Sequence, residues 1–285
     1  MTILITGARG AVGSSVLHGL RAAGHPLRAS SRRPEQLRLP VGVRSTDVEV
    51  VPLDLARPAT FAAALRGVEQ VFLYAEPGGI DELVRAAEAA GVRHVVLLSS
   101  SAALSPDAED DPLGRHHLLV ERALTWSNLD TTILRPGAFA GNAYGWSQAI
   151  RRGDPVDLAY PEALLAPIHE DDIADVAVTA LTGNAAVRGR AVTLTGPHGL
   201  TLREQVGEIA VRLGRDVPVR RPTRAAAEEQ LGRFMPADVA ASLLDHQAGT
   251  VGIRPEISTA ERITGKPGRT FGQWVDEHLD AFRPH

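Results

Sequence analysis

Three glycines, Gly7, Gly10 and Gly13, follow a short apolar run near the start of the chain. In a dinucleotide loop the first glycine permits a tight turn, the second lets the backbone approach a pyrophosphate, and the third lets a helix pack closely on a strand. The N-terminus of that helix offers free N–H groups and a partial positive charge to phosphates. The spacing therefore predicts a dinucleotide site, with a simple turn as the alternative.

The end of the second predicted strand indicates which dinucleotide binds. NAD sites usually carry Asp or Glu about 20 residues beyond the glycine loop, where the carboxylate accepts a hydrogen bond from a ribose hydroxyl. This chain instead has Ser30, Ser31, Arg32 and Arg33. Guanidinium groups beside hydroxyls suit a 2′-phosphate, which predicts NADP(H) as cofactor. The alternative is that these are surface arginines of an arginine-rich chain.

Asp54 ends the third predicted strand and is a second candidate contact for the nucleotide. Its carboxylate is expected to accept a hydrogen bond from the adenine amine. The alternative is an Asx turn, in which the carboxylate bonds the chain's own backbone two residues further on.

The chain lacks the proton donor of ordinary short-chain reductases. Those enzymes use a tyrosine whose pKa is lowered by a lysine one helical turn further on. The tyrosines here are Tyr74, Tyr144 and Tyr160, and the lysine is Lys266. No Tyr-x-x-x-Lys pair exists, so another group must supply the proton.

The segment where that pair would be expected, residues 114–124, holds His117 and Glu121 four apart on one predicted helix face. His117 is a candidate proton donor or orienter, with Ser101 hydrogen-bonding the substrate oxygen. The alternative is a packed or surface histidine with a glutamate helix partner. Without a protein acid, positioning alone can supply roughly 7 kcal/mol or more of the barrier. The proton then comes from water or from the substrate.

The strands and helices that position these residues are indicated by a regular alternation of apolar runs and Ala/Leu-rich helical segments. It predicts an α/β fold, a Rossmann doubly wound parallel sheet with a smaller, mostly helical C-terminal substrate-binding part. The expected domains are 1–137 for NADP, completed by about 168–196, and 138–167 with 197–285 for substrate. The predicted strands are 2–6, 26–31, 48–54, 68–75, 93–101, 130–137 and 190–196.

The substrate is expected in the crevice at the carboxyl ends of the strands, beside the chain after Pro136. Tyr144 and Trp146 lie in that stretch, and Phe234 and Met235 lie further on, in predicted helices. Aromatic and Met side chains suit a flat, largely apolar ligand, although each alone is more often core.

Other C-terminal features are assigned to structure. Thr201 and Glu204 form a predicted capping box. Consecutive residues of "HEDD" cannot all reach one ion from a helix, so no metal site is expected, and Asp171 or Asp172 is predicted as an N-cap. A stripe on the last helix is predicted to be core, namely Phe271, Trp274, Val275, Leu279 and Phe282.

Composition narrows the class of protein. The 285 residues include no cysteine and carry a formal net charge of −4. These values exclude disulfides and thiolate sites, and they disfavour a nucleic-acid surface. No apolar run approaches a membrane span, so a cytoplasmic protein with a small-molecule partner and no membrane partner is expected. The sequence leaves the oligomeric state open and is compatible with a monomer.

Together these segments resemble the atypical short-chain dehydrogenase/reductases of the NmrA-like group: TGARGAVG, SSRRPEQL, VPLDL, HVVLLSSSA, HLLVERAL, TTILRPGAFAGN and ITGKPGRTFGQWVDEHLDAF. The resemblance covers nearly the whole chain. It implies that the residues from Thr6 to Gly13 hold the pyrophosphate and that Arg32 holds the 2′-phosphate. The implied pyrophosphate contacts are Thr6, Gly7, Arg9, Gly10, Ala11, Val12 and Gly13.

The resemblance also implies contacts for the rest of the cofactor. Asp54 and Leu55 would flank the adenine, and Ala75 would line the ribose. The residues that would border the nicotinamide are Ser99 to Ser101 and the stretch Pro136 to Phe139, with Gly137 within it.

The function expected from these features is NADPH-dependent reduction of a ketone on a bulky aromatic polyketide. The proton would come from substrate or solvent. An actinobacterial angucyclinone-type (simocyclinone-type) tailoring ketoreductase is the particular expectation. The alternatives are an NAD(P)H quinone oxidoreductase and a non-catalytic protein that senses NADP. Sugar-nucleotide epimerisation is disfavoured because it relies on the same missing tyrosine.

Overall fold

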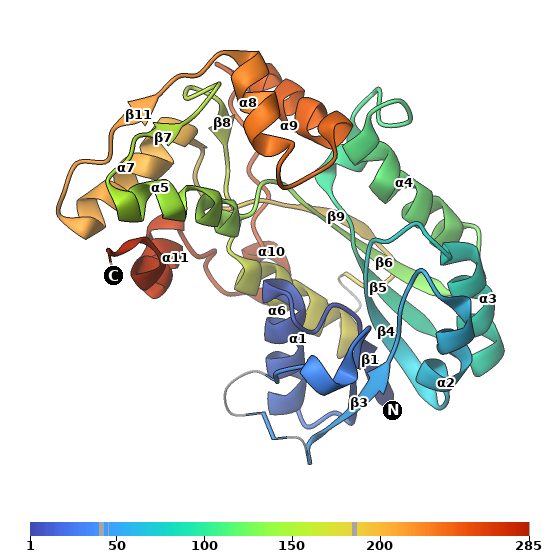
Figure 1. The fold of residues 1–285 in the computed structure, drawn as a ribbon. Helices are drawn as coiled ribbons and strands as arrows, with labels where there is room; N and C mark the ends of the chain where they lie inside the picture. The colour runs from blue at the N-terminus through green and yellow to red at the C-terminus, as the bar shows by residue number, and fades with distance from the viewer. Residues whose placement is uncertain (40–42, 45, 184–186, 285) are drawn as a thin grey trace.

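The computed structural model describes residues 1–39, 43–44, 46–183 and 187–284. The domain ranges predicted above also include residues 40–42, 45, 184–186 and 285, which lie outside the described chain. Figure 1 shows an open sheet with helices on both sides and, next to it, a mostly helical second part. None of the helices in the described ranges is long and apolar enough to cross a membrane.

A parallel sheet forms the centre of the described chain. Its seven strands lie in the order β3 (Val48–Pro52), β2 (Leu27–Ser31), β1 (Thr2–Ile5), β4 (Val68–Tyr74), β5 (His94–Leu98), β6 (Asp130–Pro136) and β9 (Ala191–Leu194). The order reverses between β1 and β4, which creates a crevice at the carboxyl ends of these strands. This doubly wound arrangement confirms the predicted fold class.

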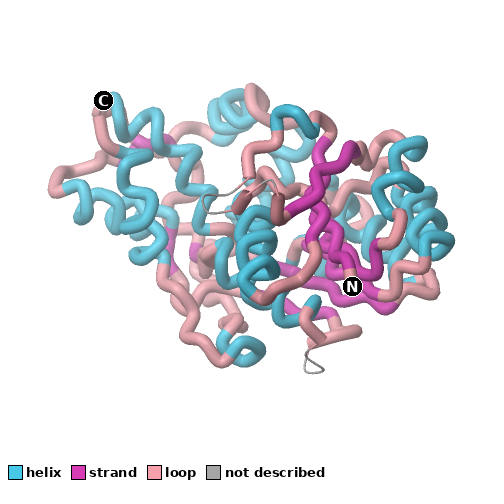
Figure 2. The backbone as a smooth tube through the Cα atoms, turned by 90° about the horizontal axis from the view of Figure 1, so that it is seen from below, coloured by secondary structure: helices cyan, strands magenta, loops and turns pink. Residues whose placement is uncertain are grey.

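Helices cover both faces of the sheet, as Figures 1 and 2 show. One face carries α1 (Ala11–Ala22) and α6 (Glu170–Leu181), and the other carries α2 (Phe61–Leu65), α3 (Ile80–Ala90) and α4 (Pro112–Thr125). Strands buried on both faces are apolar along their length rather than alternating. This is why the strands of the sheet could be recognised as continuous apolar runs.

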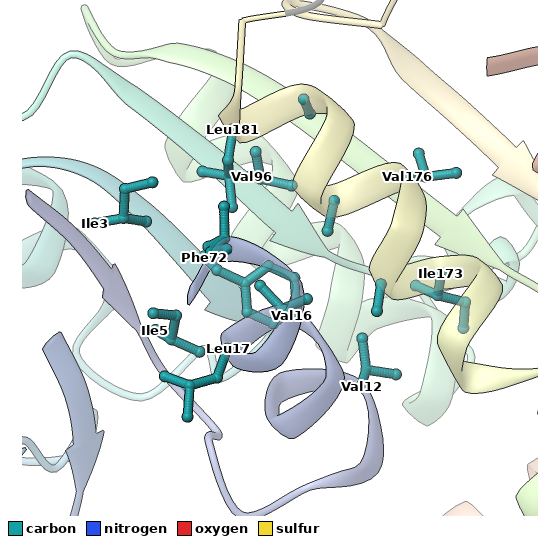
Figure 3. Close-up of a cluster of buried hydrophobic side chains, with 14 of the residues drawn as sticks. Ile3, Ile5, Val12, Val16, Leu17, Phe72, Val96, Ile173, Val176 and Leu181 are labelled. Carbon is teal, nitrogen blue, oxygen red and sulfur yellow. The ribbon is translucent and has the colours of Figure 1, made fainter. Parts of the chain in front are cut away.

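The core between the sheet and the α1/α6 pair fixes the start of α1. Figure 3 shows Ile5, Val16, Phe72 and Ile173 among the side chains of this core, and all four are buried. The two helices come close because Gly19 has no side chain; a Cβ there would lie 2.9 Å from a methyl carbon of Val178. The glycine loop is thereby held against the carboxyl end of β1.

The predicted strand 93–101 is too long. β5 ends at Leu98, and a 3₁₀ turn, η3 (Ser101–Leu104), begins three residues later. The side chain of Ser100 accepts a hydrogen bond from the N–H of Ala102 at 3.2 Å. Serine side chains compete for backbone groups in this way, which ends the strand.

The C-terminal part contains short elements and two small strand pairs, β7 with β11 and β8 with β10. Strands of two residues show no period, so the sequence did not predict these pairs. The elements are η4 (Ala140–Trp146), α5 (Ser147–Arg152), β7 (Val156–Asp157), β8 (Leu164–Leu165), β10 (Leu200–Thr201), α7 (Leu202–Leu213), β11 (Val219–Arg220), α8 (Arg224–Leu231), α9 (Ala237–Gly249), α10 (Glu261–Thr264), α11 (Phe271–His278) and η5 (Leu279–Phe282).

Two structural predictions for this part are confirmed and one is wrong. The Thr201–Glu204 capping box is present, and the stripe on the last helix is core, with Trp274 buried. The N-cap of α6 is His169 rather than Asp171 or Asp172, because its ring nitrogen Nδ1 accepts the Asp171 N–H at 3.1 Å. The acids then occupy the first turn, where the positive end of the helix dipole stabilises them.

Salt bridges attach the C-terminal segment to α6. Arg269 pairs with Asp172 and, at 3.1 Å, with Asp175. Lys266 pairs with Asp175 at 3.0 Å. Asp172 is almost completely buried, and burial raises the pKa of its carboxyl although Arg269 opposes this. The contact between the two parts of the molecule thus includes a buried charge.

Candidate active site

The glycine loop has the geometry that its spacing predicted. Gly7 has φ 63°, a left-handed conformation that only glycine adopts without strain. The N–H of Gly10 donates to the carbonyl of Gly7 at 2.8 Å and closes the turn. A Cβ on Gly13 would lie 2.3 Å from the Gly7 carbonyl oxygen, so no other residue fits there without movement.

The N-terminus of α1 is free to hold an anion. No side chain caps it and no acidic residue lies in its first turn. Arg9, Gly10 and Ala11 are exposed at this end, whereas Val12 and Gly13 are buried against the sheet. Exposed N–H groups, the helix dipole and a neighbouring guanidinium fit a pyrophosphate. Thr6 is different, because its buried hydroxyl donates to the carbonyl of Phe72 and accepts from the N–H of Tyr74.

The candidate phosphate-binding arginines lie at the end of β2. Arg32 and Arg33 are exposed, and neither forms an ion pair with a carboxylate in the described chain. The hydroxyl oxygen of Ser31 accepts the N–H of Arg33 at 3.1 Å, whereas Ser30 is buried. Two unpaired guanidinium groups beside a hydroxyl fit a phosphate dianion.

Asp54 forms the Asx turn that was the alternative interpretation. Its Oδ1 accepts the N–H of Ala56 at 3.2 Å, and its Oδ2 lies 3.4 Å from Nε of Arg57. A carboxylate oxygen can accept more than one hydrogen bond, so a contact with adenine stays a prediction. Leu55 beside it is buried in the core.

Tyr74 is a site residue that the sequence analysis did not assign. Its ring lies against the glycine loop, since a Cβ on Gly7 would be 2.9 Å from a ring carbon. Burial raises the pKa of the Tyr74 hydroxyl, Glu76 and Asp54 raise it further, and Arg32 opposes this. The ring therefore lies among the groups expected to hold the nucleotide. Its position at the end of β4, next to Ala75, was the available signal.

A charged network lies where β5 and β6 end. Glu121, on α4, is 3% exposed and accepts the hydroxyl of Ser99 at 2.5 Å. Arg135 donates to both oxygens of Glu121, at 2.6 and 3.0 Å. Ser99 thus lies at the predicted strand end, but its side chain is committed to Glu121. Glu121 is therefore not a simple helix partner of His117.

The other residues expected at the nicotinamide lie at the same strand ends. A Cβ on Gly137 would be 3.9 Å from Oγ of Ser101, so these two residues are close. Pro136 is the last residue of β6 and is buried. The carbonyl of Ala75 lies 3.1 Å from Nε2 of His116; a carbonyl only accepts, so His116 carries its hydrogen on Nε2.

His117 does not have the properties of an acid that works near neutral pH. Burial, and to a smaller extent His116, lowers its pKa to about 4, while Glu121 opposes the shift. Its Nδ1 is buried and has no hydrogen-bond partner among the described residues. Desolvation keeps the ring neutral near pH 7 and weakens the case for His117 as a proton donor, which stays a prediction.

The predicted substrate residues differ in their exposure and in their neighbours. Tyr144 is 44% exposed and packs edge-on against Trp274, with ring centroids 4.9 Å apart. Phe139, which was expected at the nicotinamide, forms a backbone bridge with Ile168 beside the sheet. Phe234 is 80% exposed, and it and the half-buried Met235 lie in the turn between α8 and α9, not in a helix as predicted.

Trp146 lines a separate cleft of about 340 Å³ in the C-terminal part. The cleft also contains polar side chains, among them Asp154, Asp157 and Arg220. Arg220 and Asp157 form a two-point ion pair, at 2.6 and 2.8 Å. None of the predicted cofactor residues lines this cleft.

One cluster could suggest a metal ion, but its hydrogen bonds argue against one. Suitable atoms of His169, Asp171 and Glu277 lie within 4.8 Å of one another. Nδ1 of His169 accepts the Asp171 N–H, so Nε2 carries the hydrogen and donates to Glu277 at 3.2 Å. A protonated nitrogen cannot bind a metal. The side chain thus acts as a cap and a bridge to α11.

The fold and the glycine loop define a dinucleotide-binding protein of the Rossmann class, and comparison with known proteins defines the family. Residues 7–184 match the model of the NAD(P)H-binding family. The chain belongs to this family, and NAD(P)H as its cofactor is confirmed at that level.

Relatives extend the match over the whole chain. The reductase of (4-alkanoyl-5-oxo-2,5-dihydrofuran-3-yl)methyl phosphate from Streptomyces griseus is 39% identical, over 99% of this chain and 99% of that protein. An NAD(P)H azoreductase from Xenophilus azovorans is 30% identical, over 98% and 99%. The chain is an NAD(P)H-dependent oxidoreductase.

A solved structure agrees with the fold. The NADPH complex of the NADPH-dependent quinone oxidoreductase of Escherichia coli superposes with a TM-score of 0.82 at 23% identity, over 98% of this chain and 100% of that one. The resemblance to atypical short-chain reductases is confirmed at the level of the fold, and the family that is shown is the NAD(P)H-binding family.

Proposed function

We propose that this protein is an NADPH-dependent reductase of a conjugated carbonyl compound and that none of its own acidic side chains protonates the product. The observation that carries the proposal is the desolvation of His117, which stands where ordinary short-chain reductases have their proton-donating pair. The Tyr-x-x-x-Lys pair is absent from the sequence. His117, which stands in its segment, has a pKa of about 4 because it is buried, so it is neutral at neutral pH.

The chemistry of the substrate then decides where the negative charge goes. Bound NADPH supplies a hydride. A conjugated acceptor spreads the resulting charge over several atoms, so it needs a weaker acid than an isolated ketone, whose alkoxide holds the charge on one oxygen. Solvent or a neighbouring substrate hydroxyl can then provide the proton. Ser101, with its hydroxyl near Gly137, is the chain's candidate donor to the substrate oxygen.

The cofactor contacts belong to the same proposal. The N–H groups at the start of α1 hold the pyrophosphate, and Arg32 and Arg33 hold the 2′-phosphate. The division into residues 1–137, completed by 168–196, for NADP and the remainder for substrate is also proposed. We place the reaction in the cytoplasm.

The first substrate class is a small unsaturated lactone or related ring in which a C=C bond is conjugated with a carbonyl. Its support is the 39% identity to the Streptomyces griseus reductase, whose named substrate is an unsaturated, phosphorylated furanone.

The second substrate class is an aromatic ketone of the angucyclinone type, or a quinone. The partly exposed ring of Tyr144 and the partly exposed Trp146 favour it, but it is the weaker candidate because Phe234 is 80% exposed rather than part of a lined pocket.

Reduction with NADPH deuterated at the transferred position tests these classes. An unsaturated lactone, a quinone and a hydroxylated polycyclic ketone are offered in parallel, and the product is analysed by NMR. Deuterium on a ring carbon β to the carbonyl supports the first class. Deuterium on a carbinol carbon supports the aromatic ketone, and a hydroquinone without deuterium on carbon supports the quinone. Tight NADPH binding without turnover of any acceptor would reject the proposal.

A further inference from the structure

Glu121 is a charged side chain that the reaction described above does not use. It is 3% exposed and lies between a serine hydroxyl and an arginine. The carboxylate accepts three hydrogen bonds, from Oγ of Ser99 at 2.5 Å and from Nη2 and Nε of Arg135 at 2.6 and 3.0 Å. Arg135 balances its charge, and the side chain of Arg135 is 21% exposed.

The network connects three elements at one point. Ser99 immediately follows β5, Arg135 is the second-last residue of β6, and Glu121 lies on α4. The N–H of Ser99 also donates to the carbonyl of Leu134 at 2.8 Å, so the two strand ends are joined by backbone and by side chains. The network therefore fixes the spacing of β5 and β6 where both strands end.

The residues expected to border the nicotinamide come directly after these anchors. Ser101 follows Ser99 by two residues, and Gly137 follows Arg135 by two. Ser101 and Gly137 approach each other, as the 3.9 Å between Oγ of Ser101 and a Cβ on Gly137 indicates. A shift of either strand end would change this approach before it changed the distant glycine loop.

We propose that the Ser99–Glu121–Arg135 network positions the ends of β5 and β6 for hydride transfer, so that Glu121 is a positioning residue for the nicotinamide half of the cofactor. Stability alone does not explain such a network. Apolar residues of similar volume in place of a buried ion pair are often neutral or stabilising. A misplacement of about 1 Å at a reacting centre can cost about a hundredfold in rate. The inference rests on the proposed placement of the nicotinamide but not on the substrate class.

The double variant Glu121→Leu/Arg135→Met tests this, because it removes both charges and keeps the volume. Three quantities are compared with wild type: the melting temperature, the dissociation constant of NADPH, and the fluorescence of bound NADPH. Hydride transfer is also measured in a single turnover, with a water-soluble quinone and an unsaturated lactone as acceptors. We expect an unchanged melting temperature and similar NADPH affinity, since the adenosine end still binds. Hydride transfer should fall about a hundredfold, and the fluorescence should shift toward that of free NADPH.

A matched control lies at the other end of the same strand. Asp130 begins β6 and pairs with Arg188 at 2.6 Å. The variant Asp130→Leu/Arg188→Met should leave hydride transfer and the fluorescence of bound NADPH unchanged. If the Glu121/Arg135 variant behaves like this control, the network is structural only and the inference is overturned.

Single substitutions keep the test decisive if the double variant does not fold. Ser99→Ala should lower hydride transfer, and Ser99→Thr, which keeps the hydroxyl, should restore it; equal rates in both would reject the inference. If wild type turns over none of the acceptors, the proposed function fails. The fluorescence of bound NADPH in the Ser99 variants still decides the positioning role.

Discussion

In the glycine loop of residues 1–137 the backbone shapes the candidate site, whereas in the C-terminal part contacts between side chains hold the structure together. The glycine loop depends on a left-handed Gly7 and on a Gly13 that leaves no space for a Cβ. The C-terminal part instead has two-residue strands, an aromatic cluster around Trp274 and salt bridges to α6. Backbone constraints allow one geometry, while side-chain contacts can be replaced singly. A single substitution in the glycine loop should therefore have a large effect on the site, whereas single substitutions in the C-terminal part should lower stability step by step.

The largest effect is expected for Gly13→Ala, because the new Cβ would meet the Gly7 carbonyl oxygen at 2.3 Å. The loop or α1 must move, so NADPH affinity should fall by more than about a hundredfold, which is at least ~2.7 kcal/mol. Fluorescence titration with NADPH measures this. Gly207→Ala is the control: nothing lies within 4 Å of that position on α7, and Ala there should stabilise the protein by about 0.5–1 kcal/mol. Unchanged affinity in Gly13→Ala would contradict the backbone argument.

Arg269→Ala tests the attachment of the C-terminal part to α6, which includes the buried carboxylate of Asp172. It leaves Asp172, which is 3% exposed, without its guanidinium partner. The free energy of unfolding should fall by about 3 kcal/mol, as measured by urea denaturation, with NADPH affinity nearly unchanged. Arg203→Ala breaks an exposed pair with Glu162 and should cost about 1 kcal/mol or less. Equal losses in the two variants would show that the attachment to α6 does not depend on burial.

A pH effect on stability should come from a buried histidine in residues 1–137. Burial, with a smaller contribution from Arg188, lowers the pKa of His94 from 6.5 to about 4. The unfolded chain therefore binds the proton more readily. The contribution of His94 to the free energy of unfolding is complete above pH 6.5. It decreases as the pH falls from 6.5 toward 4, by up to about 3 kcal/mol. Urea denaturation at several pH values measures the slope, and His94→Gln should remove about half of it, because the pKa of His117 is lowered in the same way. The same slope in that variant would assign the effect elsewhere.

A smaller effect is expected for Arg32→Ala, which removes a charge-assisted contact to the 2′-phosphate. KM for NADPH should rise roughly ten- to hundredfold, about 1.5–3 kcal/mol, while KM for NADH stays the same. Arg152→Ala, at the end of α5, is an exposed arginine control and should change neither value. An equal rise in KM for NADPH and for NADH would mean that Arg32 does not recognise the 2′-phosphate.

The smallest effect is expected for His117→Ala combined with Ser101→Ala. A site that relies on substrate or solvent for the proton should lose less than about tenfold in kcat, roughly 1.4 kcal/mol. With a His117 pKa of about 4, the wild-type rate should show no ionisation of this residue between pH 5 and 8. A loss of a thousandfold would mean that a protein acid is essential.

The sequence predicted the fold and the cofactor loop because both produce patterns among residues that are close together in the sequence. Apolar runs buried on two faces identified the strands, and glycine spacing identified the loop. The partner of Glu121 was not predictable, since Arg135 is close only after β6 is placed beside α4. The cap at His169 was missed because histidine is an unusual N-cap, and here it also depends on Glu277 from a distant helix. Tertiary contacts of this kind have no local signal.

Asp111 connects the two regions of the molecule that were compared above. One of its carboxylate oxygens caps α4 by accepting the N–H of Gly114 at 2.6 Å, and the other accepts the hydroxyl of Ser242 on α9. A single side chain thus joins the first turn of the helix bearing His117 to the helical hairpin over the C-terminal part. Any ligand that displaces α9 must stretch or break this link. Because α4 and α9 also pack against each other, a shift of α9 would change the position of the start of α4.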